Sequence, residues 1–113
     1  MPIQHVNEVV TMLPVHKLYV GLSCSDSLTQ AYRNNVVKIV AGRIESFTIT
    51  DALGYFRGMP EQTLVITIAH DDFELVENIA DELRVQLRQD GIGLEFEGMY
   101  YRVTSPHNAR LEV

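Results

Sequence analysis

The stretch IESFTITDALGYFRGMPEQTLVITI, residues 44–68, decides the fold of this 113-residue chain. Apolar and polar side chains alternate along residues 44–51 and again along residues 62–69, and this period of two is typical of β-strands. Between them, residues 51–60 contain two glycines and a proline, so we expect the chain to loop or turn somewhere within them. The stretch therefore predicts two neighbouring strands joined by a loop of about ten residues, with no helix between them.

A strand and a helix precede this stretch. Residues 15–23 alternate as a strand, and the apolar side chains of residues 28–40 recur at helical spacing. Ser27 and Gln30 have the spacing of a capping box, in which two side chains satisfy the first backbone N–H groups of a helix. The sequence thus predicts a strand followed by a helix that ends near Ala41.

A second helix and a last strand follow it. Residues 73–87 place apolar side chains down one helical face, behind a capping box of Asp71 and Glu74, and Gly91 is the expected end of that helix. Residues 92–103 alternate as a strand, but the alternation changes phase near Gly98. This shift predicts a β-bulge or a bend within one long strand.

The resulting order, β-α-β-β-α-β, predicts an α+β protein of the ferredoxin-like βαββαβ type. In that sandwich a four-stranded antiparallel sheet carries two helices on one face. A doubly wound parallel sheet would need a helix between the second and third strands, where only a loop is expected. We expect one domain over residues 1–113, with a core of about residues 15–104, an N-terminal arm at 1–14 and a C-terminal tail at 105–113.

The composition excludes several classes of protein. Hydrophobic residues make up 46% and charged residues 21%, which is typical of a folded globular chain. The net charge of −6 and the scattered basic residues argue against binding to nucleic acid. No apolar run approaches the roughly 20 residues of a membrane span, no signal peptide is recognisable, and the single Cys24 cannot form an internal disulfide. We therefore expect a cytoplasmic protein with no membrane partner.

In this predicted sandwich the helices cover one face of the four-stranded sheet, and its other face is left uncovered. Tyr19, Val65, Thr67 and Tyr100 are expected on that face, and they are more apolar or β-branched than contact with water requires. Such a surface is commonly covered by association with a second copy. The sequence therefore predicts a homo-oligomer.

The element Phe56-Arg57-Gly58, followed by Glu61, carries a resemblance to known families. Residues 44–68 resemble the central hairpin of small ferredoxin-like proteins of the CutA and PII-like group. The chain is also similar to uncharacterised small bacterial and phage proteins that share this element, followed by a helix and a pair such as Gln89-Asp90. The resemblance covers about residues 17–103.

The resemblance implies a trimer, favoured over a dimer, with small ligands or metal ions bound in clefts between subunits. The chain departs from the PII-like pattern because it lacks a long nucleotide-sensing loop. It departs from the CutA pattern because it lacks a histidine-bearing C-terminal segment. ATP sensing and copper binding are therefore not expected.

The candidate ligand site comprises Asp51, Tyr55, Arg57 and Glu61. The glycines beside them let a ligand approach the backbone closely. Arg57 has the geometry to hold an anionic group through two hydrogen bonds, and Tyr55 has a ring that can stack on a ligand. The alternative is a twisted hairpin in which Arg57 and Glu61 form an exposed ion pair of little energetic value.

Neither a metal site nor a catalytic residue is predicted. His70, Asp71 and Asp72 are the best local metal candidates, but no histidine has a ligand-like spacing and the two acids are explained as helix caps. Cys24 precedes a helix, which can lower a thiol pKa, yet no recognised nucleophile motif surrounds it. The sequence identifies no cofactor.

Three functions remain open. The leading prediction is an oligomeric protein without catalysis that binds a small, anionic molecule or acts as a regulator. The first alternative is a small enzyme of the dimeric ferredoxin-like kind, which requires a deep polar cavity inside one subunit containing His16, His70 or Cys24. The second alternative is a structural or inhibitory module that binds another protein.

Overall fold

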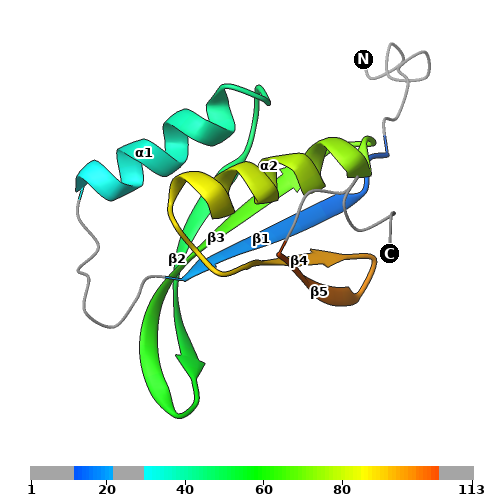
Figure 1. Cartoon of the computed structure of the whole chain (residues 1–113). Helices are drawn as coiled ribbons and strands as arrows, with labels where there is room; N and C mark the ends of the chain where they lie inside the picture. Colours follow the sequence, from blue (N-terminus) through cyan, green and yellow to red (C-terminus); the bar gives the residue numbers. More distant parts are fainter. Residues whose placement is uncertain (1–11, 22–29, 105–113) are drawn as a thin grey trace, which may run out of the picture.

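The computed structural model describes residues 12–21 and 30–104 (Figure 1). Ser27 and Cys24 lie outside these residues, as do most of the N-terminal arm and the C-terminal tail. The described elements, in chain order, are β1 (Val15–Gly21), α1 (Gln30–Ala41), β2 (Thr48–Phe56), β3 (Met59–Ala69), α2 (Phe73–Gln86), β4 (Ile92–Phe96) and β5 (Met99–Val103). Among these residues, no helix has the length and apolarity that crossing a membrane requires.

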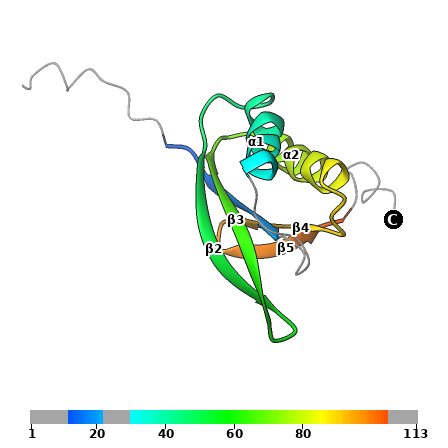
Figure 2. The same ribbon diagram turned by 90° about the vertical axis from the view of Figure 1, so that its left-hand side faces the viewer.

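The strands form one antiparallel sheet in the order β2-β3-β1-β4-β5. The central strand is β1, which pairs with β3 along one edge and with β4 along the other. Both helices lie on the same face of the sheet (Figure 2). The α+β class, the antiparallel sheet and the two helices on one face agree with the sequence prediction, and the architecture is compatible with a ferredoxin-like fold.

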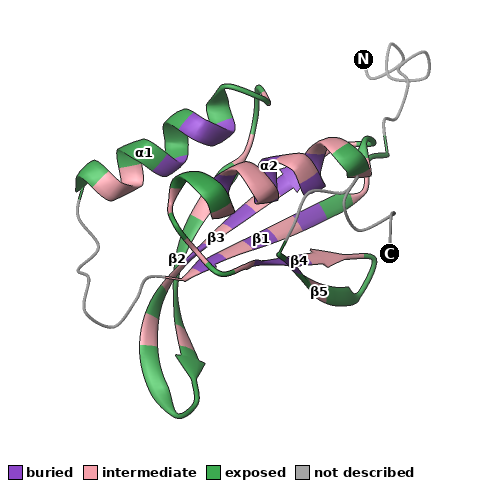
Figure 3. Cartoon of the chain, viewed as in Figure 1, coloured by how far each residue is buried: buried purple, intermediate pink, exposed green. Residues whose placement is uncertain are grey.

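The core lies between the sheet and the helices, because alternate residues of the central strands point to the helical side. Leu18 and Val20 of β1 and Ile66 of β3 are completely buried, and so is Leu83 of α2. Figure 3 shows this buried layer along the strands and on the inward side of α2. The core further comprises Val36, Ile39, Val40, Leu64, Ile68, Val76, Ile79, Ala80, Ile92, Leu94 and Val103.

The sheet has five strands, so the prediction of four was wrong. The segment expected as one strand over 92–103 is a hairpin, in which Phe96 of β4 pairs with Met99 of β5. The turn between them is Glu97-Gly98, and both residues have positive φ, 52° and 78°. The change of phase near Gly98 therefore marks a reversal of the chain rather than a bulge, because a two-residue turn of this kind needs positive φ at both positions.

The chain turns within residues 51–60 as predicted, but the expected loop length of about ten residues was wrong. β2 runs on to Phe56 and β3 begins at Met59, so only Arg57 and Gly58 form the turn. Both have positive φ, 52° and 79°, as the tight hairpin turn requires. Pro60 is accommodated within β3 opposite Tyr55 of the edge strand. Glycine and proline in this stretch therefore belong to a hairpin and do not interrupt it.

The ends of α2 differ from the prediction. Its N-cap is Asp72, not Asp71, and the Asp72 carboxylate accepts a hydrogen bond of 3.0 Å from the Leu75 N–H. The helix ends at Gln86, five residues before Gly91. The Gln89 N–H donates to the Arg84 carbonyl and the Arg88 N–H to that of Val85, an arrangement typical of a Schellman motif.

The Schellman motif places Arg88 at φ 57°, where glycine is preferred because its lack of a Cβ removes the steric cost. We expect Arg88→Gly to raise the free energy of unfolding by about 1 kcal/mol. Arg88→Ala is the matched control, since it removes the charge but keeps a Cβ, and its stability should stay close to wild type. Urea denaturation measures both. A glycine variant no more stable than the alanine variant would contradict the assignment.

Candidate functional site

The β2–β3 hairpin projects beyond the helix-covered core (Figures 1 and 3). Four large side chains on it are exposed, with between 56% and 68% of their surface accessible: Leu53, Tyr55, Phe56 and Met59. At the turn, the Arg57 guanidinium lies over the Phe56 ring, 5.0 Å from its centre, in a cation–π contact. The predicted site residues therefore lie on or beside a protruding and largely apolar hairpin.

The structure divides the four predicted residues between the two faces of this hairpin. Asp51 pairs with Leu64, whose side chain is buried on the helical side, so Asp51 and Tyr55 face that side. Glu61 is offset by an odd number of residues from Leu64 and faces the opposite side. Arg57 occupies the turn between them. Within one subunit the four side chains do not converge on one point.

Asp51 is already engaged by a helix. The Arg33 guanidinium of α1 donates to the Asp51 carboxylate at 2.7 Å. The pair is partly exposed, so its contribution to stability is small, but it links the start of α1 to the edge strand β2. Asp51 is thus placed as a structural contact between helix and sheet.

Glu61 lies across the central strand at Gly21. A Cβ built at Gly21 would come within 2.5 Å of the Glu61 Oε1 atom, so only glycine leaves room for the carboxylate there. A Cβ built at Gly54 of β2 would likewise come within 2.8 Å of the Thr63 Oγ1 atom. The Thr63 hydroxyl also donates to the Glu61 carbonyl at 3.2 Å. Glu61 consequently lies on the sheet's open face over the last residue of β1, and the role of Gly21 was missed by sequence reasoning.

A second polar cluster occupies the same open face near β4 and β5. The Tyr19 hydroxyl donates to the Glu95 carboxylate at 2.6 Å, and the Tyr19 ring meets that of Tyr100 edge to face with 5.8 Å between centres. The hydrogen bond to Glu95, followed by burial, raises the pKa of Tyr19 to about 12. The Tyr100 side chain lies over Gly93, where a Cβ would clash with it.

Sequence reasoning placed Tyr19 and Tyr100 on this face but did not recognise the cluster. The available signal was the pair of glycines at alternate positions, Gly91 and Gly93, which are covered by the side chains of Arg102 and Tyr100 respectively. Large side chains that cover cross-strand glycines are a recurrent device for holding the register of a sheet.

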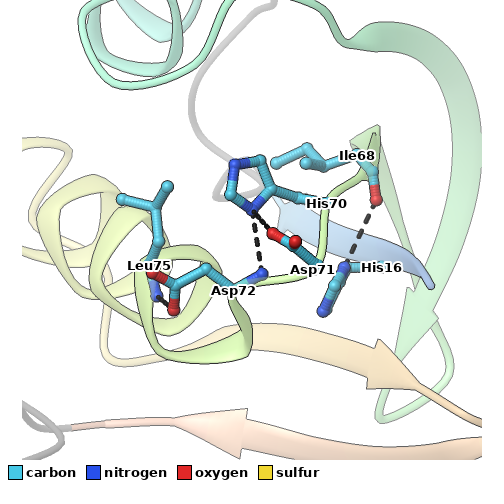
Figure 4. A network of polar contacts seen from close by, with 6 residues as sticks. All are labelled: His16, Ile68, His70, Asp71, Asp72 and Leu75. Atoms are coloured by element: carbon cyan, nitrogen blue, oxygen red, sulfur yellow. Dashed lines mark hydrogen bonds and ion pairs between the residues drawn. The ribbon is translucent and has the colours of Figure 1, made fainter. Parts of the chain in front are cut away.

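His16 is buried on the helical side of the sheet. Its ring stacks on Phe96 with 4.6 Å between centres and also contacts Phe73 of α2. Nδ1 lies 3.3 Å from the Ile68 carbonyl oxygen (Figure 4), so we assign the proton of the neutral ring to Nδ1. Nε2 has no hydrogen-bond partner among the described residues. Burial, the largest influence, lowers the pKa of His16.

His70 has a different, structural role. Its Nδ1 accepts a hydrogen bond of 2.9 Å from the Asp72 N–H and lies 3.5 Å from the Asp71 carboxylate (Figure 4). These contacts hold the turn that leads from β3 into α2. Within residues 12–21 and 30–104, no three side chains of the metal-binding types come together.

The deep polar cavity required by the enzyme alternative is not formed by the described residues. Their two best-formed hollows are shallow, with volumes of about 280 and 240 Å³. The first lies between Arg43, Glu45 and His70 and does not reach His16, and the second lies between α1 and α2. Neither hollow touches the predicted ligand residues of the hairpin, and Cys24 lies outside the described part.

Comparison with known proteins gives one structural likeness. No protein-family model matches the chain, and no curated protein matches it. Among solved structures, the chain is similar to a phage SAM lyase in its apo state, with 20% sequence identity and a TM-score of 0.58. The match covers 81% of this chain and 89% of that one. At this identity the likeness shows the fold alone.

The buried environment of His16 predicts a dependence of stability on pH. The folded protein keeps the ring neutral, whereas the unfolded chain protonates it near the usual pKa of 6.5. The contribution of the neutral His16 ring to the free energy of unfolding is therefore complete above that pH. It is lost as the pH falls below it, by at most about 1.4 kcal/mol per pH unit. His16→Phe should reduce this loss in urea unfolding measured between pH 7.5 and 5.

His70→Gln is the matched control for that measurement, because it removes a partly exposed histidine and leaves His16 in place. It should retain the loss of stability on acidification. If His16→Phe and wild type lost stability equally between pH 7.5 and 5, the neutral, buried assignment of His16 would be wrong.

Proposed function

We propose that the protein is a homo-oligomer that binds a small anionic molecule in a cleft between subunits, without catalysis. The observation that carries this proposal is the exposure of Leu53, Tyr55, Phe56 and Met59 on a hairpin that projects from the core. Large apolar side chains clustered in this way commonly mark a surface that another molecule covers. In the cytoplasmic, trimeric protein that we propose, a second copy is that molecule.

A site between subunits also accounts for the division of the predicted ligand residues. Tyr55 and Arg57 lie on the helical side and at the turn of the hairpin, and no hollow of the described chain adjoins them. A ligand held only by these side chains would remain largely in water. Small-molecule sites normally bury most of the ligand, so a second surface is needed to complete the site.

Arg57 is the residue to which we assign recognition of the ligand's negative charge. Within the described part of the chain it forms no ion pair, and its guanidinium is oriented by the Phe56 ring. An arginine stacked on an aromatic ring keeps its outer N–H groups available for two parallel hydrogen bonds to a carboxylate or phosphate. Glu61, held across Gly21, is placed to accept hydrogen bonds from the same ligand or from the neighbouring subunit.

The second candidate is a small enzyme, because a phage SAM lyase shows that a similar fold can carry an enzymatic activity. In that case the half-buried carboxylate of Glu61 and the exposed phenol of Tyr55 are the groups available for chemistry at the hairpin. A module that binds another protein is the third candidate, and the exposed hydrophobic surface of the hairpin is compatible with it.

Removal of the two charged hairpin side chains tests the leading proposal. We expect native mass spectra of freshly purified protein to show an oligomer with retained small molecules. Arg57→Ala and Glu61→Ala should each lower the ligand-bearing fraction about tenfold or more, because charge-assisted hydrogen bonds are lost. Arg88→Ala changes an arginine that follows α2 and is not part of the hairpin, so it is the control and should retain the ligand. Unchanged ligand retention and assembly in both hairpin variants would refute the proposal.

Displacing Glu61 without deleting it gives a finer test. Gly21→Ala introduces a Cβ against the end of the flexible Glu61 side chain, so the fold should survive while the carboxylate moves. We expect the same loss of retained ligand as in Glu61→Ala. Gly58→Ala is an unsuitable control because Gly58 has positive φ. Ser46→Ala lies just before β2, at the end of the hairpin opposite its turn, and should behave as wild type.

SAM is the probe that separates the two leading candidates. The proposal without catalysis predicts that SAM incubated with the oligomer is recovered intact at the rate of the buffer blank, as followed by chromatography. Turnover by wild type that is abolished in Glu61→Gln would replace the leading proposal with the enzyme candidate.

A further inference from the structure

The described chain carries two separate sets of exposed apolar side chains. The hairpin patch wraps around the tip of the β2–β3 hairpin, with Leu53 and Tyr55 on the helical side and Phe56 and Met59 on the open side. A second set, which we term the β5 patch, surrounds the start of β1 and the turn between β4 and β5, and its members are between 42% and 85% exposed: Met12, Leu13, Val15, Met99 and Tyr100. A monomer would leave both sets in water.

The two patches lie at opposite ends of the central strand. β1 ends at Gly21, which pairs with Thr63 on the side from which the β2–β3 hairpin extends. β1 begins at Val15, beside His16, which pairs with Phe96 at the β4–β5 turn. Figure 1 shows the two hairpins extending in different directions from opposite edges of the sheet. The patches of one subunit therefore cannot cover each other.

The turns within the two patches carry opposite charges in matching positions. Arg57 precedes Gly58 in one turn and Glu97 precedes Gly98 in the other, and both charged residues have φ 52°. Asparagine, aspartate or glycine is the usual residue at such a position, and a larger side chain there is strained. These turn positions put one positive and one negative side chain at the outermost points of the two hairpins.

The charges near the two turns reinforce this complementarity. In the β5 patch, the other nearby acid, Glu95, is already bonded to Tyr19, which leaves Glu97 as the carboxylate at the tip. In the hairpin patch, the Glu61 carboxylate is drawn back over Gly21, away from the turn, so Arg57 provides the charge at that tip. One hairpin tip thus combines apolar side chains with a positive charge, and the other combines apolar side chains with a negative charge, so the two tips are complementary.

We propose that the hairpin patch of one subunit docks on the β5 patch of a second copy, with Arg57 against Glu97 of the partner subunit, and that repetition of this contact closes a ring. The inference rests on the proposed oligomeric function and specifies its interface. Because the two patches of one chain differ and both must be covered, each subunit contacts one neighbour through each patch. The ligand cleft then lies where the hairpin of one subunit meets the sheet end of the next, and the five N–H donors of the Arg57 guanidinium serve both Glu97 of the partner subunit and the ligand.

Charge reversal tests the contact. Arg57→Glu and Glu97→Arg each place like charges together at every interface. In native mass spectra over a dilution series, each variant should therefore dissociate at a protein concentration at least roughly tenfold higher than the wild type does. The double variant, R57E combined with E97R, restores opposite charges at every interface and should recover assembly. Arg88→Glu reverses the charge of an arginine that has a similar positive φ but lies outside both patches. It is the matched control and should assemble as the wild type does.

The rescue separates a lost contact from a lost fold, because a misfolded single variant would not be repaired by a second reversal. Unfolding curves by circular dichroism check each variant independently. If wild type assembles and keeps its ligand while both single reversals assemble equally well, this interface is wrong and the proposed intersubunit function stands. A monomeric wild type overturns both proposals.

Discussion

The pairing of β1 on both edges is the constraint on which the rest of the structure depends. All seven of its residues pair with β3 and residues 16–19 also pair with β4. The alternation along β1 places Leu18 and Val20 under the helices, while Tyr19 and Gly21 face the open side. A register shift of one residue would exchange these two sets and expose the core. The fixed register of β1 therefore determines which side chains form the core and which remain available for contacts with other molecules.

The same pairing sets the geometry of the proposed function. β3 and β4 both run antiparallel to β1, but β3 begins at its hairpin turn whereas β4 ends at its turn. The turns of the two hairpins therefore lie toward opposite ends of the sheet. Each turn combines a charged residue at positive φ with a glycine, and each is surrounded by exposed apolar side chains. A chain with two different apolar patches at opposite ends of its sheet is suited to a closed, head-to-tail assembly, in which two neighbouring subunits together form the ligand site.

Most of the elements, but not the site geometry, could be predicted from the sequence. Periodicity located both helices and the strands because it reports which side of an element is buried. It failed at residues 51–60 and near Gly98, where glycine was interpreted as a loop or a bulge although tight turns also require it. A ten-residue loop would let Asp51 and Glu61 converge, whereas a two-residue turn places them on opposite faces. The approach of Glu61 to Gly21 depends on a cross-strand neighbour that local sequence does not specify.

Assembly through both ends of the sheet is the central claim, and sedimentation velocity of the full-length chain over a range of concentrations tests it most directly. The account predicts one closed species whose mass is a fixed multiple of the 12.8 kDa subunit, without larger polymers. A species of 12.8 kDa at every concentration would contradict it, because both apolar patches would then remain in water.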